Sequence, residues 1–190
     1  AVIDPIGSIP IFMAVTKKYA QQDKNKIATN AALISAGVLL FFLVVGEIIL
    51  KKMGVSLPAF QVSGGIILFL FALSMIFGES KTDEEMRIID NKKDTAVFPL
   101  AMPSIASPGA ILAVVLLTDN SRHSIANQAI TAIIMLVIVF ITWVLMIQSK
   151  HIYRYIGDSG ASITSRIIGL ILAAIAANNF LVGLKQFFHI

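Results

Sequence analysis

The stretch Asp4-Pro5-Ile6-Gly7-Ser8-Ile9-Pro10 decides the fold of this chain, together with a later segment of similar pattern, Met102-Pro103-Ser104-Ile105-Ala106-Ser107-Pro108-Gly109. Each segment has two prolines five residues apart in otherwise apolar sequence. Proline removes a backbone donor and clashes with the preceding helical turn, and non-helical backbone at membrane depth survives only inside protein or beside a water-filled cavity. We therefore expect two helix breaks, the first break at 4–10 and the second break at 102–109, with four breaking residues: Pro5, Pro10, Pro103 and Pro108.

The composition is that of a membrane protein. Of the 190 residues, 57% are hydrophobic and only 14% are charged, against about 25% charged in a typical soluble domain. The mean hydropathy is +0.85. The absence of cysteine excludes disulfides and thiolate metal sites. The net charge of +4 is small and its basic residues lie between apolar stretches, which argues against nucleic acid as a partner.

Six membrane spans are expected, at 1–16, 27–50, 54–78, 96–117, 125–147 and 163–188. The first and fourth contain the two breaks. The chain opens inside an apolar stretch, so we expect that part of the first span is missing. Basic residues gather in the first, third and fifth loops, which predicts that these loops face the cytoplasm and that both termini face outside.

A shift of the sequence by about 98 residues aligns the two halves. It places Pro5 on Pro103, Pro10 on Pro108 and the start of the second span on that of the fifth. This predicts two units of three spans, 1–95 and 96–190. Because three is odd, the second unit is inverted in the membrane relative to the first. The predicted fold is thus all-α, with six transmembrane helices in two inverted three-helix repeats, although any six-span protein with prolines in its helices can show some match of this kind.

The residues before Pro5 and Pro108 predict a binding site. Asp4-Pro5 and Ser107-Pro108 each place a capping side chain before a proline, the preferred start of a helix. The two half-helices would point free N–H groups and positive dipole ends into the breaks, where a carboxylate can bind. Gly7 and Gly109 would let a ligand approach the backbone closely. A pocket of this kind suits a small zwitterion.

A few further polar side chains lie in apolar sequence. Asp4 could pair with a substrate ammonium, carry a coupling proton, or only cap its half-helix. Asn178 and Asn179 point about 100° apart, so one of them faces a central pocket or they hold the bundle by interhelical hydrogen bonds. Glu47 precedes Lys51 by one turn and is expected to form an ion pair with it.

Small residues at four-residue intervals predict two faces for close helix packing. One face consists of Ala28, Ala32 and Ala36, and the other of Gly169, Ala173 and Ala177.

The sequence contains none of the common enzyme motifs. It has no phosphate-binding Gly-rich loop with its lysine, no paired-His zinc motif and no second acid to form a dyad with Asp4. The three histidines, His123, His151 and His189, show no ligand spacing, so no metal site is expected. We therefore predict that the protein is not an enzyme and needs no cofactor, apart from a possible coupling ion, a proton or sodium.

The chain resembles the MarC family of integral membrane proteins, also described as a neutral amino acid transporter family. The resemblance covers essentially the whole chain and rests on 4–12, Gly46-Glu47-Ile48-Ile49-Leu50, 63–70, Pro99-Leu100-Ala101-Met102-Pro103 and Pro108-Gly109-Ala110-Ile111. It implies a multi-pass protein of a prokaryotic inner membrane, some relatives of which carry glycine, alanine and similar amino acids. The family often has Asn where Ser8 stands and sometimes where Asp4 stands, which favours a capping or contact role for Asp4.

The expected function is secondary transport of a small neutral amino acid by alternating access. Substrate contacts are expected from Asp4, Gly7, Ser8, Ser107, Gly109 and Asn178. The alternatives are a structural or signalling membrane protein whose breaks only kink the bundle, and a passive channel for small solutes. The exact substrate, the transport direction and the oligomeric state stay open.

Overall fold

The computed structural model describes residues 2–77, 95–120 and 123–188, and these residues are helical wherever they form regular structure. In chain order the helices are α1 (Ser8–Thr16), α2 (Gln21–Lys52), α3 (Leu57–Phe77), η2 (Ala96–Ile105), α6 (Pro108–Leu117), α7 (Ile125–Ile147) and α8 (Ser149–Phe187). The third predicted loop, which joins the third and fourth predicted spans at 79–95, lies outside the described residues except for its last residue.

Four helices are long and apolar enough to cross a membrane: α2, α3, α7 and the Ser162–Phe187 part of α8. The pair of η2 and α6, bent by 53°, makes a fifth span if it crosses as one unit. The predicted first span is represented by α1, whose nine residues reach only about 14 Å at 1.5 Å per residue. The described residues therefore contain four or five candidate spans, and the predicted count of six is not confirmed.

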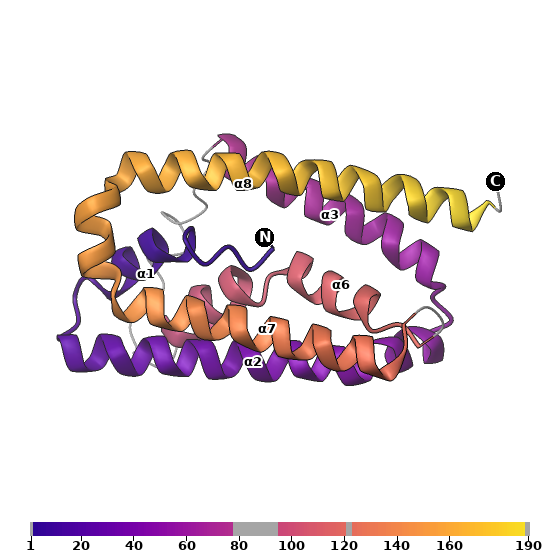
Figure 1. Cartoon of the computed structure of the whole chain (residues 1–190), viewed down its shortest axis with the longest axis horizontal. Helices are drawn as coiled ribbons and strands as arrows, with labels where there is room; N and C mark the ends of the chain where they lie inside the picture. The colour runs from indigo at the N-terminus through magenta and orange to yellow at the C-terminus, as the bar shows by residue number, and fades with distance from the viewer. Residues whose placement is uncertain (1, 78–94, 121–122, 189–190) are drawn as a thin grey trace.

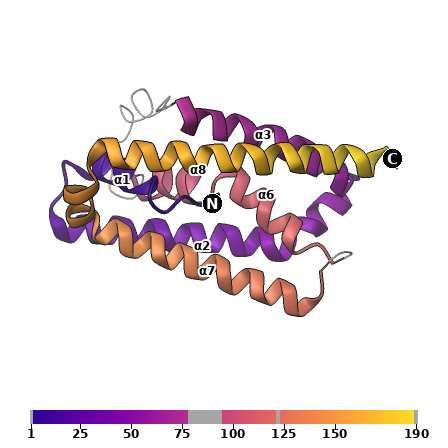
Figure 2. The ribbon, with the colours of Figure 1, turned by 45° about the horizontal axis from the view of Figure 1, so that its top comes forward.

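The helices form two antiparallel pairs with the broken segments between them (Figure 1). α3 runs beside α8 along one side of the molecule, and α2 runs beside α7 along the other. α1, η2 and α6 lie between the two pairs, as the turned view also shows (Figure 2). The larger of two buried apolar clusters joins α1, α2, η2 and α7, and its fully buried side chains include Phe12, Leu39, Leu100 and Met146.

The contact between α3 and α8 contains glycines and alanines beside the buried Leu68 and Leu172, and we call it the α3–α8 seam. A Cβ at Gly65 would lie 2.9 Å from the Phe180 nitrogen, and one at Gly183 would lie 3.0 Å from the Val62 nitrogen. Such close backbone approach is typical of membrane helices with small interface residues.

The seam differs from the prediction in its spacing. Its α8 side uses Gly169, Ala176 and Gly183, seven residues apart, whereas the predicted Ala177 is exposed and Ala173 is half-buried. Two helices that run nearly alongside each other meet every seven residues, which the sequence spacing alone does not reveal. On α2 the predicted face is confirmed for Ala28 and Ala32, which are buried, and Ala36 is half-buried.

Candidate functional site

The second break begins where two residues that precede prolines leave the helical conformation. The backbone is extended at Phe98 (φ −129°, ψ 129°) and at Met102 (φ −130°, ψ 128°). The reason is that a proline ring disfavours the α region for the residue before it. The chain becomes regular again at α6, whose first residue is Pro108. The predicted break at 102–109 is present, and the irregularity starts four residues earlier than expected.

Ser107 is the N-cap of α6, as predicted. Its hydroxyl accepts a hydrogen bond from the Ala110 nitrogen at 3.1 Å. Its own backbone is extended, with φ −66° and ψ 157°. Its carbonyl accepts from the Ile111 nitrogen at 3.0 Å. The side chain is fully buried. Two of the amides predicted to be free at the start of α6 are thus already partnered by the capping residue.

Asp4 caps the turn that leads into the first half-helix, whose own N-cap residue is Gly7. Its Oδ1 accepts from the Gly7 nitrogen at 3.0 Å, and its carbonyl accepts from the Ser8 nitrogen at 3.1 Å. Helix α1 then begins at Ser8 and runs through Pro10. The expectation that the helix stays open as far as Pro10 is wrong, because Pro10 lies in the first turn, where its missing N–H is not needed. The chain before α1, residues 2–7, is not helical.

The two breaks meet in the middle of the molecule (Figure 1). The hydroxyls of Ser8 and Ser104 lie 3.4 Å apart, and the Ser107 hydroxyl donates to the Val2 carbonyl at 3.4 Å. A third element joins them, because a Cβ on Gly7 would lie 3.1 Å from the hydroxyl of Ser165 on α8. The predicted convergence of the two breaks is therefore present in the structure.

The two glycines of the breaks have different surroundings. A Cβ on Gly7 would lie 2.0 Å from Asp4 Oδ2, so the carboxylate rests directly against this residue. A Cβ on Gly109 would lie 2.4 Å from Leu68 Cδ1 and 2.8 Å from Val2 Cγ1. We expected both glycines to let a ligand approach the backbone closely. In the structure the Asp4 carboxylate occupies this space at Gly7, and apolar side chains fill it at Gly109.

The site is a small polar cluster within an apolar centre. Asp4, Ser8 and Ser107 are buried, and Ser104 and Ser165 are half-buried. The hydroxyls can donate to a carboxylate or accept from an ammonium, and the Asp4 carboxylate can pair with an ammonium. The N-terminal ends of α1 and α6 add positive potential at the same place. The cluster therefore offers groups complementary to both charges of a zwitterion.

Two members of this cluster were missed by the sequence analysis. Ser104 lies inside the quoted second break but was not chosen as a contact residue. Ser165 carries no local signal, because it reaches the breaks only through the packing of α8 on α1. The predicted Asn178 is exposed and lies farther along α8 than Ser165, by roughly 20 Å at 1.5 Å per residue. The structure does not bring Asn178 to the breaks.

Comparison with known proteins identifies the family. Residues 1–188 match the family described as "MarC family integral membrane protein". The chain belongs to the MarC family. A "UPF0056 membrane protein" of Aquifex aeolicus is 33% identical over 190 residues, which cover 98% of this chain and 88% of that protein. The Escherichia coli "UPF0056 inner membrane protein YhgN" is 33% identical over 186 residues, 97% of this chain and 91% of that protein.

Membership of the MarC family establishes an integral membrane protein. The name of YhgN places that relative in an inner membrane, and the helices of the present MarC chain carry exposed apolar residues such as Leu33 and Val44, at 66% each, as lipid contact requires. No solved structure matches the chain. The names of these MarC relatives specify no substrate, so the chemistry of the site has to be argued from its own residues.

Proposed function

We propose that this MarC protein is a secondary transporter of small neutral amino acids, of the size of glycine or alanine. The observation that supports this most directly is the contact of the two capped half-helices at the centre of the molecule. The substrate carboxylate would lie at the N-termini of α1 and α6, within reach of the Ser8 and Ser104 hydroxyls. The ammonium would face Asp4. Those hydroxyls lie 3.4 Å apart, close enough for one carboxylate to accept a hydrogen bond from each.

The pairing of the helices supports two inverted repeats, at 1–95 and 96–190. Under the predicted alignment α2 corresponds to α7, and α3 corresponds to α8. In the structure each of these helices packs antiparallel against its own counterpart (Figures 1 and 2), which is the arrangement expected about a two-fold axis in the membrane plane. With α1 as part of a broken first span, the total would be six. Rocking of one unit against the other would expose the central site to each side in turn.

Of the three roles predicted for Asp4, the contacts of its carboxylate directly support capping. Because its carboxylate caps the Gly7 amide, a capping role is already fulfilled without substrate. Coupling of transport to a proton or sodium gradient is compatible with this role. The substitution Asp4→Asn keeps an oxygen acceptor for the cap and removes the charge. If Asp4 only caps, Asp4→Asn transports with the same proton dependence as the parent.

The proposal is tested by uptake of radiolabelled alanine and glycine into proteoliposomes, with and without excess unlabelled substrate inside. We expect saturable uptake that internal substrate accelerates. A passive channel would show neither saturation nor counterflow. A structural or signalling protein would show no uptake above empty liposomes. That last result, from folded protein under imposed proton and sodium gradients, would overturn the proposal.

A further inference from the structure

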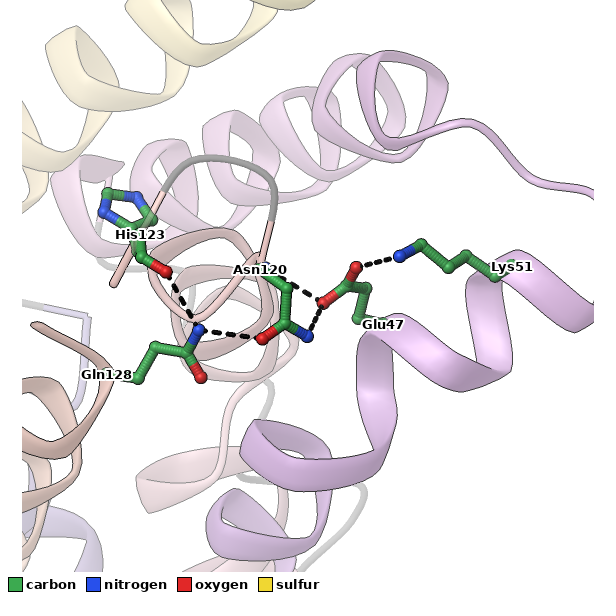
Figure 3. A network of polar contacts seen from close by, with 5 residues as sticks. All are labelled: Glu47, Lys51, Asn120, His123 and Gln128. Carbon is green, nitrogen blue, oxygen red and sulfur yellow. Dashed lines mark hydrogen bonds and ion pairs between the residues drawn. The ribbon is translucent and has the colours of Figure 1, made fainter. Parts of the chain in front are cut away.

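A buried carboxylate connects the end of α2 to the segment between α6 and α7 (Figure 3). Glu47 exposes only 9% of its surface. Its Oε2 accepts two hydrogen bonds from Asn120, from the backbone nitrogen at 3.0 Å and from Nδ2 at 2.5 Å. Its Oε1 forms an ion pair with Lys51. The predicted pair of Glu47 with Lys51 is therefore confirmed, whereas the Asn120 contacts have no signal in the sequence.

The network continues into the first turn of α7. Gln128 Nε2 donates to Asn120 Oδ1 at 3.0 Å and to the His123 carbonyl at 3.1 Å. Hydrogen bonds to an ionised group are roughly twice as strong as neutral ones. Glu47 thus forms the strongest link in a chain of contacts that connects α2 with both ends of the α6–α7 connection.

The same interface is closed by packing one turn away. The Thr118 hydroxyl donates to the Leu43 carbonyl of α2 at 3.2 Å. A Cβ on Gly46 would lie 2.5 Å from Val115 Cγ2, so α2 and α6 approach closely here. Val115 exposes only 2% of its surface. Water therefore reaches Val115 only if α2 and α6 separate.

We propose that Glu47, Lys51, Asn120 and Gln128 form a latch that holds this end of the molecule closed. The inference rests on the proposed transport by alternating access, in which the two predicted units must part at each end in turn. Glu47 and Lys51 belong to the first unit, and Asn120 and Gln128 belong to the second. Opening of this end breaks the charge-assisted bonds between the units, so the latch sets how often the end opens.

At the opposite end of the bundle, one contact between the two units is neutral: Trp143 Nε1 donates to the Thr29 hydroxyl at 3.0 Å. A neutral hydrogen bond contributes less than one to a charged group, so this contact holds the two units together less strongly than the bonds of Glu47 do.

The absence of cysteine from the chain allows a direct test by thiol labelling. Val115→Cys reports on the latched interface, and Ala28→Cys, at a fully buried position near the other end of α2, reports on the rest of the molecule. The probe is a water-soluble maleimide, applied to full-length protein in liposomes without substrate. We expect Glu47→Ala to raise the labelling rate of Val115→Cys by about tenfold or more, because charge-assisted bonds are lost, and to leave that of Ala28→Cys unchanged.

Two lysines in the same turn provide a matched control. Lys51→Ala removes the partner of Glu47, whereas Lys52→Ala removes an exposed lysine one position away. Both variants lose one positive charge at the end of α2. Labelling of Val115→Cys should increase in Lys51→Ala and stay at the parent rate in Lys52→Ala.

A reversed pair tests the contact between Glu47 and Asn120 itself. Asn120→Asp alone brings two carboxylates together and should raise the labelling rate of Val115→Cys. When Glu47→Gln is added, the new amide at position 47 can donate a hydrogen bond to the new carboxylate at position 120, so donor and acceptor are exchanged. The labelling rate of Val115→Cys should then return toward that of the parent. The proposal is overturned if Glu47→Ala leaves the labelling of Val115→Cys unchanged, or if it raises both reporters equally, as general loosening would. Labelling needs no substrate, so a failure of uptake and a failure of the latch are distinguishable.

Discussion

Gly7 is the residue where the need for the smallest side chain is clearest. The Asp4 carboxylate lies against it, with Oδ2 at 2.0 Å from the position of an added Cβ. We expect Gly7→Ala to displace this carboxylate, to break the cap on the Gly7 amide and to lower the free energy of unfolding by about 1–3 kcal/mol. Uptake should fall with it, because Asp4 would leave the site. Thermal unfolding in detergent and proteoliposome uptake measure the two effects.

Gly37 provides the matched control for this substitution. It lies in the middle of α2, and a Cβ there would meet no atom within 4 Å. Because alanine is favoured over glycine in a helix by about 0.8–1 kcal/mol, Gly37→Ala should leave stability unchanged or raise it. If both variants behave alike, the contact of Asp4 with Gly7 is not what makes Gly7 sensitive.

Helices α6 and α7 both start with a serine N-cap. Variants of the two serines can therefore distinguish the loss of a cap from the loss of substrate binding. Ser107 and Ser124 both have dihedrals of −66°, 157°, and each accepts from the amide three residues on, at 3.1 and 3.4 Å. Replacement of either serine by alanine should cost about 1 kcal/mol of stability. Only Ser107→Ala should reduce amino acid uptake, because Ser124 is exposed and lies away from the breaks. Uptake at the parent level in Ser107→Ala would remove Ser107 from the substrate site.

Local rules of sequence predict elements well and their contacts poorly. The cap at Ser107 and the Glu47–Lys51 pair were predictable, because both depend on residues within four positions of each other. Pro10 was misread because a proline breaks a helix or starts one, depending on a boundary only a few residues away. Asn120 and Ser165 were missed because their partners lie in other helices, and no periodicity links them.

For the whole molecule, the lysines predict an orientation that cysteine labelling can test. The starts of α2 and α8 lie at one end of the molecule, and the ends of both helices lie at the other (Figure 1). Gln22 and Tyr155 are near the starts, Met53 and Lys185 are near the ends, and all four are exposed. Each is replaced singly by cysteine. In intact cells a membrane-impermeant thiol reagent should label Met53→Cys and Lys185→Cys, and should label the other two only after permeabilisation, because basic loops stay in the cytoplasm. The reverse pattern would contradict the predicted orientation.

The α3–α8 seam has a consequence for the variation that this protein can tolerate. Glycine is the smallest residue, so any substitution at Gly65, Gly169 or Gly183 adds atoms where backbone already stands at about 3 Å. A core of large side chains can lose a methyl group and repack, or gain one elsewhere in compensation. The α3–α8 seam cannot compensate in this way, because no residue is smaller than glycine. In a library of random variants selected only for folding, we therefore expect these three glycines to be retained in the surviving sequences.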